Sequence, residues 1–299
     1  MSDTVRIIGA PADYGANRRG VDMGPSAIRY ADLARKLERS GVETEDWGDL
    51  STPRPEVRDP DVGTANAKFL DEIEALSWYL ADEVADAIDA GTTPLVLGGD
   101  HSVAIGSMAG SARDTAIGVV WFDAHGDFNT PSTSPSGNVH GMPLAAALGR
   151  DEFGSMPWAQ ALGLSEENVA IVGLRDLDSA ERDAIRDSDV TAFTMSDVDE
   201  RGITAVVDDA LAAAGRGVDG VHVSFDLDFL DPVTAPGVGT PVRGGATYRE
   251  AHAAMEGAAE SGLVRSLDLV EVNPVFDERN ETAELAAGLA GSAFGTRTL

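Results

Sequence analysis

In GVVWFDAHGDFNT, residues 118–130, an apolar run ends abruptly in charged side chains. Residues 119–122 are apolar without alternation, which is the pattern of a strand buried on both faces of a parallel sheet. Asp123, His125 and Asp127 follow at alternate positions, so an extended chain places them on one side. Loops at the carboxyl ends of parallel strands form the ligand sites of open α/β proteins. Taken alone, this stretch predicts either a functional site or an acidic loop that caps a helix.

Two further stretches repeat the same pattern. In GVHVSFDLDFLDP, residues 220–232, an apolar strand leads into Asp226 and Asp228, and in PLVLGGDHSVAIG, residues 94–106, another leads to His101. Neighbouring carboxylates repel each other in a dry site unless a cation lies between them. Acidic and imidazole side chains at three strand ends therefore favour a metal site over three separate capping loops.

Apolar strand-like segments alternate with helical ones along the chain, and this alternation predicts an α/β fold. The strand-like segments are residues 5–8, 95–97, 117–122, 169–172, 221–225 and 267–272. Residues 65–91 are helical in pattern, because apolar side chains recur every three or four positions until Gly91. No linker interrupts the pattern, so we expect one domain, residues 1–299, with a parallel sheet covered by helices on both faces.

Several classes of protein are excluded by composition. The chain has no cysteine, which removes disulfides, thiolate catalysis and cysteine-bound zinc. No apolar run reaches the ~18 residues of a membrane helix, and the first residues lack the features of a signal peptide. We therefore expect a cytoplasmic protein with no membrane partner.

The chain is strongly acidic, with 51 acidic against 22 basic residues and a formal net charge of −29. Such a surface makes nucleic acid an improbable partner. The acidic residues are spread through apolar, periodic segments, which indicates a folded protein and not a disordered tail. Lys36 and Lys68 are the only lysines. Because salt screens self-repulsion, this charge predicts a halophile's protein.

The three motifs GGDHS, DAHGD and SFDLDFLDP resemble the metal motifs of the ureohydrolases, which include arginases, agmatinases and their relatives. The resemblance to arginases extends over nearly the whole chain, through the segments IIGAPADYGANRRGVDMGPSAIR, NTPSTSPSGNVHG, GLRDLD, GTPVRGGATYRE and EVNP. It implies a three-layer α/β/α sandwich around an eight-stranded, mostly parallel sheet. It also implies a homo-oligomer, either a trimer or a hexamer.

The resemblance further implies two metal ions per chain, whose ligands are the residues that match the family's metal motifs. The first ion would be held by His101, Asp123, Asp127 and Asp226, and the second by Asp123, His125, Asp226 and Asp228. Asp123 and Asp226 would bridge the two ions. Four carboxylates and two imidazoles form an oxygen-rich set, which favours Mn²⁺.

By the same resemblance, the reaction would be hydrolysis of L-arginine to L-ornithine and urea. A metal pair lowers the pKa of a water molecule held between the ions, so that it can attack the guanidinium carbon. Glu271 matches the carboxylate that binds the guanidinium, and Asp127 would accept a proton. His140 matches the proton shuttle to the leaving amine. The alternative for His140 is a histidine that only stabilises its loop.

Seven residues are expected to contact the rest of the substrate: Asn129, Ser134, Ser136, Asn138, Asp178, Glu181 and Thr240. The amide and hydroxyl groups that follow the second metal motif would bind the α-carboxylate. Asp178 and Glu181 would accept hydrogen bonds from the α-ammonium, with helix capping as their alternative. Thr240 belongs to the GTPVRGGATYRE segment.

The remaining polar residues near these motifs have more ordinary interpretations. Asp100 precedes His101 and is expected to support the loop, while His222 in a strand and His252 in a helix are expected to be structural. Three other functions stay open: another ureohydrolase activity (agmatinase, guanidinobutyrase or formimidoylglutamase), a catalytically silent metal-bound scaffold, and another two-metal reaction such as phosphoester cleavage. Phosphoester cleavage would require cationic groups that the motif loops lack.

Overall fold

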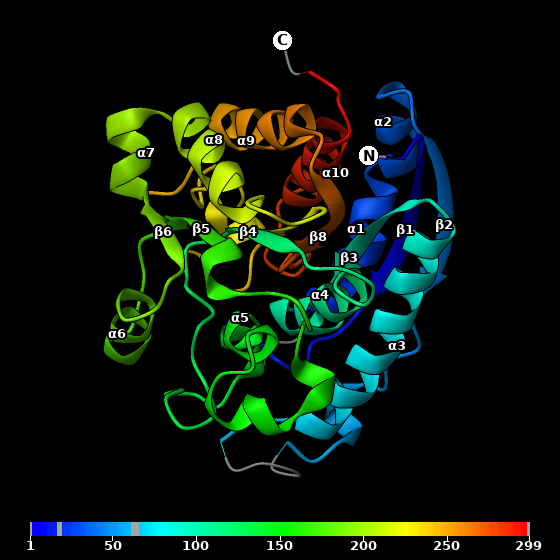
Figure 1. Cartoon of the computed structure of the whole chain (residues 1–299). Coiled ribbons are helices and arrows are strands. Elements are labelled where there is room, and N and C mark those ends of the chain that lie inside the picture. Colours follow the sequence, from blue (N-terminus) through cyan, green and yellow to red (C-terminus); the bar gives the residue numbers. More distant parts are fainter. Residues whose placement is uncertain (1, 17–19, 61–65, 298–299) are drawn as a thin grey trace.

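The computed structural model describes residues 2–16, 20–60 and 66–297, and an eight-stranded sheet lies at its centre (Figure 1). The strands are β1 Thr4–Ala10, β2 Glu43–Asp49, β3 Thr93–Gly98, β4 Gly118–Phe122, β5 Val169–Leu174, β6 Thr191–Thr194, β7 Val221–Asp226 and β8 Val264–Val270. Their order is β2-β1-β3-β8-β7-β4-β5-β6, and every neighbouring pair is parallel. The predicted sheet is confirmed, and it is wholly parallel where a mostly parallel one was expected. Residues 17–19 of the amino-terminal motif and residue 65 of the predicted helix lie outside the described residues.

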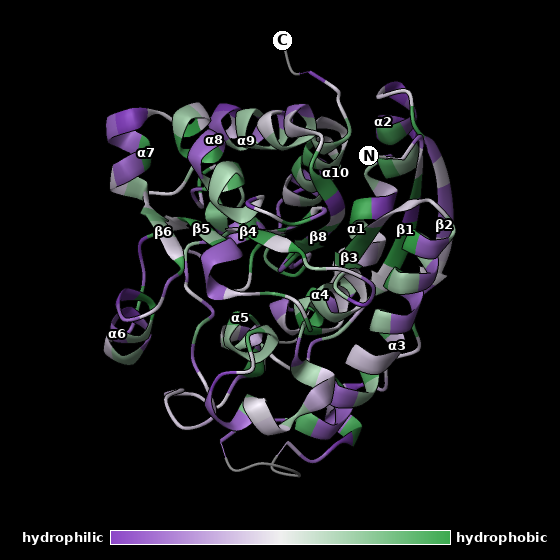
Figure 2. Cartoon of the chain, in the orientation of Figure 1, coloured by the Kyte–Doolittle hydropathy of each residue, from purple (hydrophilic) through white to green (hydrophobic). Residues whose placement is uncertain are grey.

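The predicted strands are the interior ones, and the two that the sequence analysis missed form the edges of the sheet. All residues of β3, β4, β5 and β7 are buried, which explains the apolar runs of the first three. In β7, VHVSFD, the buried polar residues His222 and Ser224 alternate with apolar ones and form hydrogen bonds. Edge strand β2 has the sequence ETEDWGD and is mostly exposed, and β6 at the opposite edge is half exposed. Figure 2 shows the contrast between purple β2 and green β1. An edge strand needs no apolar run, and charged side chains protect it from pairing with another chain.

Helices cover both faces of the sheet, as predicted (Figure 1). One layer contains α1 Gly24–Tyr30, α2 Leu33–Arg39, α7 Met195–Arg201, α8 Ile203–Ala214, α9 Tyr248–Ser261 and α10 Glu281–Ala293. The other contains α3 Leu70–Asp89, α4 Ala104–Ser111, α5 Pro143–Ala147 and α6 Ser179–Arg186. No helix in the described part of the chain combines the length and apolarity needed to span a membrane.

Helix α3 shows how the sequence pattern determines the packing of one layer. Its apolar side chains at Ile73, Leu80 and Val84 are buried against the sheet, and polar residues face outward. The helix ends at Asp89, and Gly91 has a φ of 77°, a conformation that glycine adopts without strain. The predicted span of residues 65–91 therefore exceeds the observed helix by a few residues at each end.

Aromatic packing supports the strand ends that carry the acidic residues. The rings of Phe122, Phe225 and Phe229 pack in a cluster with centroids 5.4–5.5 Å apart. Each of the three residues is next to a metal-motif aspartate in the sequence: Phe122 precedes Asp123, Phe225 precedes Asp226 and Phe229 follows Asp228. Fully buried rings allow little local movement, so this cluster fixes the positions from which the carboxylates project.

Candidate metal centre and substrate pocket

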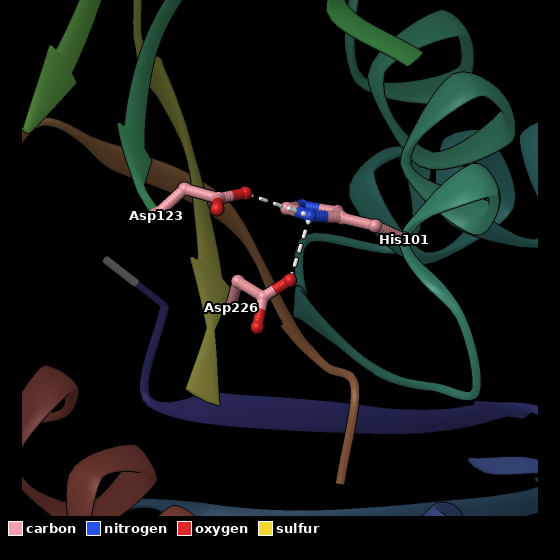
Figure 3. A group of neighbouring side chains, drawn as sticks. All are labelled: His101, Asp123 and Asp226. Carbon is pink, nitrogen blue, oxygen red and sulfur yellow. Dashed lines mark ion pairs between the residues drawn. The ribbon is translucent and has the colours of Figure 1, made fainter. Parts of the chain in front are cut away.

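Three strand ends converge at the carboxyl edge of the sheet. Asp123 follows β4, Asp226 ends the neighbouring strand β7, and His101 begins the short 3₁₀ helix η3 (His101–Val103) after β3. Figure 3 shows the two carboxylates and the imidazole pointing toward one another from these elements. Gly99, which precedes His101 in GGDHS, lies so close to the segment after β1 that a Cβ would be 1.8 Å from the carbonyl oxygen of Ala12. The glycine therefore lets the His101 loop approach this segment.

The first group of potential ligands surrounds one ring nitrogen. His101 Nδ1 lies 3.1 Å from Asp123 Oδ2, 3.0 Å from Asp127 Oδ2 and 3.2 Å from Asp226 Oδ2. His101, Asp123 and Asp226 form a buried triad in which all ligand atoms lie close enough to hold one ion. The four predicted ligands of the first metal are thus brought together.

Two residues that the sequence analysis missed orient the His101 ring. Its Nε2 lies 2.8 Å from Ser224 Oγ, and the ring stacks on Trp121 with centroids 4.1 Å apart. Trp121 Nε1 also donates a hydrogen bond to Asp123 Oδ2 at 3.0 Å. Contacts of this kind leave Nδ1 as the nitrogen available to a metal. Both residues precede a metal-motif Asp by two positions and so share its face of the sheet, a signal that could have identified them.

A second triad adjoins the first and shares Asp123 with it. His125 Nδ1 is 3.4 Å from Asp123 Oδ1 and 3.0 Å from Asp228 Oδ2, and these three residues could hold another ion. Asp226, predicted as the second bridging ligand, belongs to the first triad only. Its role as a bridge therefore stays a prediction, whereas Asp123 already contributes to both triads.

The chemistry of these side chains fits two divalent cations. His101 Nδ1 is buried and has no hydrogen-bond partner among the described residues, although three carboxylate oxygens surround it. Burial, together with the charges of Asp228 and Asp123, raises the pKa of Asp226 well above its usual range. Burial and the charge of Asp123 likewise raise the pKa of Asp228. A cation between these groups would offset both effects, since it favours the ionised carboxylates.

Backbone strain coincides with the functional positions. Asp127 has a φ of 50° and Glu271 a φ of 64°, in the left-handed region that non-glycine residues seldom occupy. Such conformations are unfavourable by ~1–3 kcal/mol each and persist where surrounding packing imposes them. Both residues were predicted to take part in catalysis, and their strained backbones are consistent with side chains held in fixed positions.

A cavity of about 250 Å³ opens beside the metal triads. It is lined by His125, Asp127, Asn129, His140, Gly141, Asp176, Asp178, Glu181, Asp226 and Thr240. Asp176 and Gly141 were not predicted. Asp176 stands two positions before Asp178 in GLRDLD and lies 3.9 Å from His125 Nε2, so the alternating acidic pattern could have indicated it. Five of the ten lining residues are acidic and none is a lysine or arginine, which suits a cationic ligand.

Asp178 and Glu181 combine the two roles that the sequence left open. Asp178 Oδ1 accepts hydrogen bonds from the backbone of Ala180 and Glu181 and so caps α6, while Oδ2 accepts one from Asn129 Nδ2 at 2.8 Å. Burial raises the pKa of Glu181 to about 8, whereas hydrogen bonds from the Glu181 backbone and Asn129 outweigh desolvation and lower the pKa of Asp178. Near neutral pH, therefore, Asp178 carries a negative charge and Glu181 is largely neutral.

His140 is paired with Glu271. Its Nδ1 lies 3.1 Å from Glu271 Oε1, and the same oxygen accepts a hydrogen bond from the backbone of His101 at 3.1 Å. Burial alone would lower the pKa of His140, but the hydrogen bond to Glu271 outweighs it and raises that pKa. Glu271 is 1% exposed and does not line the cavity, and its Oε2 has no partner among the described residues. Its predicted contact with a guanidinium stays a prediction.

The predicted substrate residues divide between the cavity and its surroundings. Asn129, Asp178, Glu181 and Thr240 line the cavity, and Thr240 Oγ1 donates to Asp228 Oδ2 at 3.0 Å. Three others are outside the lining: Ser134 Oγ accepts from Gly137, Ser136 Oγ accepts from Asn138, and Asn138 contacts other segments of the chain. Their contact with a substrate carboxylate stays a prediction.

The residues interpreted as structural have structural contacts. Asp100 accepts hydrogen bonds from the backbones of Ser102 and Gly15 and thus supports the His101 loop. His222 is fully buried between Ser266 and Asp268, and His252 Nδ1 is 2.8 Å from Ser292 Oγ. None of these three lines the cavity beside the metal triads.

A wholly parallel sheet with two adjoining acidic triads at its carboxyl edge defines a class of protein: an α/β protein with a paired metal site, as in two-metal hydrolases. The model of the arginase family matches residues 3–295. The arginases of Brevibacillus brevis and Bacillus caldovelox are each 48% identical to the chain, over 100% and 99% of both sequences respectively. The native structure of the Bacillus caldovelox arginase superposes with a TM-score of 0.94 at 47% identity and covers all of both chains. The chain belongs to the arginase family.

Proposed function

We propose that the protein hydrolyses L-arginine to L-ornithine and urea with two Mn²⁺ ions per chain. The observation that carries the proposal is the pair of triads sharing Asp123, which open onto an acidic cavity of about 250 Å³. The similarity to bacterial arginases over the full length of the chain supports arginine as the substrate. The oxygen-rich ligand set supports manganese over zinc.

In this proposal the ligands are those of the two predicted sets, with Asp123 and Asp226 as bridges. When bound, the ions would supply the Lewis acidity that makes a water molecule nucleophilic near neutral pH. Ser224 and Trp121 hold the His101 ring, and Nδ1 would be the nitrogen that binds the first ion. Thr240 Oγ1 donates to one oxygen of Asp228 and the Ala124 backbone N–H to the other, which would hold this carboxylate in place beside His125 for the second ion.

The remaining residues bind the guanidinium and move protons. Asp127 accepts the proton released as water adds to the guanidinium carbon, and Glu271 pairs with the guanidinium. His140 then protonates the leaving amine. Its bond to Glu271 raises the pKa of His140, which supports this role because the acid form persists to higher pH.

Substrate selection would depend on the outer part of the cavity. Asp178 supplies the charge that attracts the α-ammonium, and Glu181 contributes a hydrogen bond. Asn129, Ser134, Ser136 and Asn138 supply the donors for the α-carboxylate. Agmatine has no α-carboxylate, so an agmatinase does not require donors for one. The presence of these four donors therefore favours arginase over the agmatinase alternative.

The proposal extends to the state of the protein in the cell. We propose a single domain over residues 1–299 that acts in the cytoplasm as a homo-oligomer, a trimer or a hexamer. The family resemblance supports the assembly. The absence of cysteine is compatible with a reducing compartment.

The test is urea and ornithine release from L-arginine by protein stripped of metal and then reloaded. Activity that is absent after chelation and returns best with Mn²⁺, at close to two ions per chain, supports the proposal. A metal-loaded protein that binds arginine without releasing urea would instead support the silent scaffold. Full activity of the metal-free protein contradicts the metal-dependent mechanism.

A further inference from the structure

A short segment before α3 holds the loop that is proposed to bind the α-carboxylate. Asn66 Nδ2 donates to the carbonyl oxygens of Pro131 and Ser134, both at 2.8 Å. The backbone N–H of Lys68 donates to the carbonyl oxygen of Gly137 at 2.9 Å. Residues 66–68 thus contact both ends of the 131–138 loop, although more than 60 residues separate them in sequence.

The Lys68 side chain extends the same contact to the end of that loop. Its Nζ donates to Asn138 Oδ1 at 3.0 Å, and Asn138 Nδ2 donates to the carbonyl oxygen of Ala16 at 3.4 Å. A lysine ammonium can only donate, so it fixes which side of the amide carries the oxygen. Asn138 Nδ2 has a second N–H, and this orientation keeps it as a donor for an anionic ligand.

The positive charge of Lys68 contrasts with the acidic residues of the neighbouring cavity. Lys68 is one of two lysines in a chain of net charge −29, and half of the residues that line the neighbouring cavity are acidic. Acidic walls attract the guanidinium and α-ammonium of arginine but repel its α-carboxylate. A cation bonded to the carboxylate-binding loop counteracts that repulsion where the carboxylate would lie.

We propose that Lys68 is a positioning residue that selects substrates with an α-carboxylate, because it orients the Asn138 amide and places a positive charge beside the loop. The inference rests on the proposed function. Agmatine has no carboxylate and therefore gains nothing from Lys68. Loss of Lys68 is expected to weaken binding of arginine and leave turnover of bound substrate nearly unchanged, since Lys68 does not contact the metal triads.

The test compares three variants of the Mn²⁺-loaded protein. Lys68→Met removes the hydrogen bond and the charge, and Lys68→Arg retains both. Lys36→Met removes the other lysine, whose Nζ bonds the carbonyl oxygen of Glu284 on the opposite helix layer, and is the matched control. Urea release gives kcat and KM for arginine and agmatine, and calorimetry gives the affinities of L-ornithine and of putrescine, which lacks the carboxylate.

For Lys68→Met we expect kcat/KM for arginine to fall about tenfold through KM, and ornithine affinity to fall similarly. Agmatine kcat/KM and putrescine affinity should change less than about twofold, Lys68→Arg should restore most of the loss, and Lys36→Met should match the wild type. Equal losses for arginine and agmatine, or no loss for arginine, would overturn the inference. A wild-type protein that releases no urea from arginine contradicts the proposed function, whereas an active wild type with an unaffected Lys68→Met variant contradicts only this inference.

Discussion

Replacing Asp178 by Asn separates the two roles of this side chain. Asp178 Oδ1 caps α6 through two backbone N–H groups, and Asn caps helices about as well as Asp. Only the hydrogen bond from Asn129 Nδ2 to Oδ2 is lost, so stability should fall by ~1 kcal/mol. The charge that would pair with the α-ammonium is lost. A hydrogen bond to a charged group contributes ~1.5–3 kcal/mol, and each ~1.4 kcal/mol is tenfold. The arginine kcat/KM should therefore fall by about 10- to 150-fold.

The assay measures urea release from arginine by wild type, Asp178→Asn and Asp178→Ala, together with metal content and thermal unfolding. Asp178→Ala also removes the cap and should lose a further ~1 kcal/mol of stability. Both variants should retain the wild-type metal content, because Asp178 belongs to neither triad. An arginine kcat/KM within twofold of the wild type for Asp178→Asn, or a loss of activity that follows a loss of metal, would contradict this role of Asp178.

Three other predictions follow from the same site and from the charge of the chain. Burial raises the pKa of Glu181 to about 8, so the folded protein holds a proton that the unfolded chain releases above about pH 4.3. Glu181 should therefore lower the stability of the protein by up to ~5 kcal/mol as pH rises from about 4.3 to 8. Burial raises the pKa of Asp13 to about 8 too, so Glu181→Gln should reduce the fall in stability measured by urea unfolding of the metal-free protein without abolishing it; parallel pH curves for both proteins would contradict it. Asp123→Asn should lose metal from both sites in metal analysis while His252→Ala keeps it, and equal loading of the two variants would argue against Asp123 as a shared ligand. The net charge of −29 should make the melting temperature rise with KCl toward 1 M, where the Debye length is about 3 Å, and a flat or falling curve would speak against the salt requirement.

Sequence patterns identified the interior of the sheet and the metal triads for the same physical reason. A strand covered on both faces is largely apolar, so charged residues that follow its apolar run mark the sheet edge where ligands bind. Asp123 and Asp226 both stand directly after such runs. The edge strands β2 and β6 are largely open to solvent and need no apolar run, so they were not predicted.

The outer part of the site was less predictable, because it depends on contacts between distant segments. Ser134 and Asn138 are plausible donors by composition, yet Asn66 holds the backbone carbonyl of Ser134 and Lys68 holds the Asn138 side chain. No local pattern encodes such a pairing. Asp178 illustrates a different limit: its position predicts a helix cap and a ligand equally well, and the structure places it in both roles.

The most direct test of the account is a side-by-side measurement of kcat/KM for L-arginine, agmatine and guanidinobutyrate with the Mn²⁺-loaded protein. Agmatine differs from arginine only by the missing α-carboxylate, so it leaves the donors of the 129–138 loop unpaired. Sites built to pair with polar groups reject ligands that lack them, by ~10⁴-fold in favourable cases. We expect arginine to exceed agmatine by at least about a hundredfold. Agmatine turnover equal to or faster than that of arginine would contradict the account and assign the protein to agmatine hydrolysis.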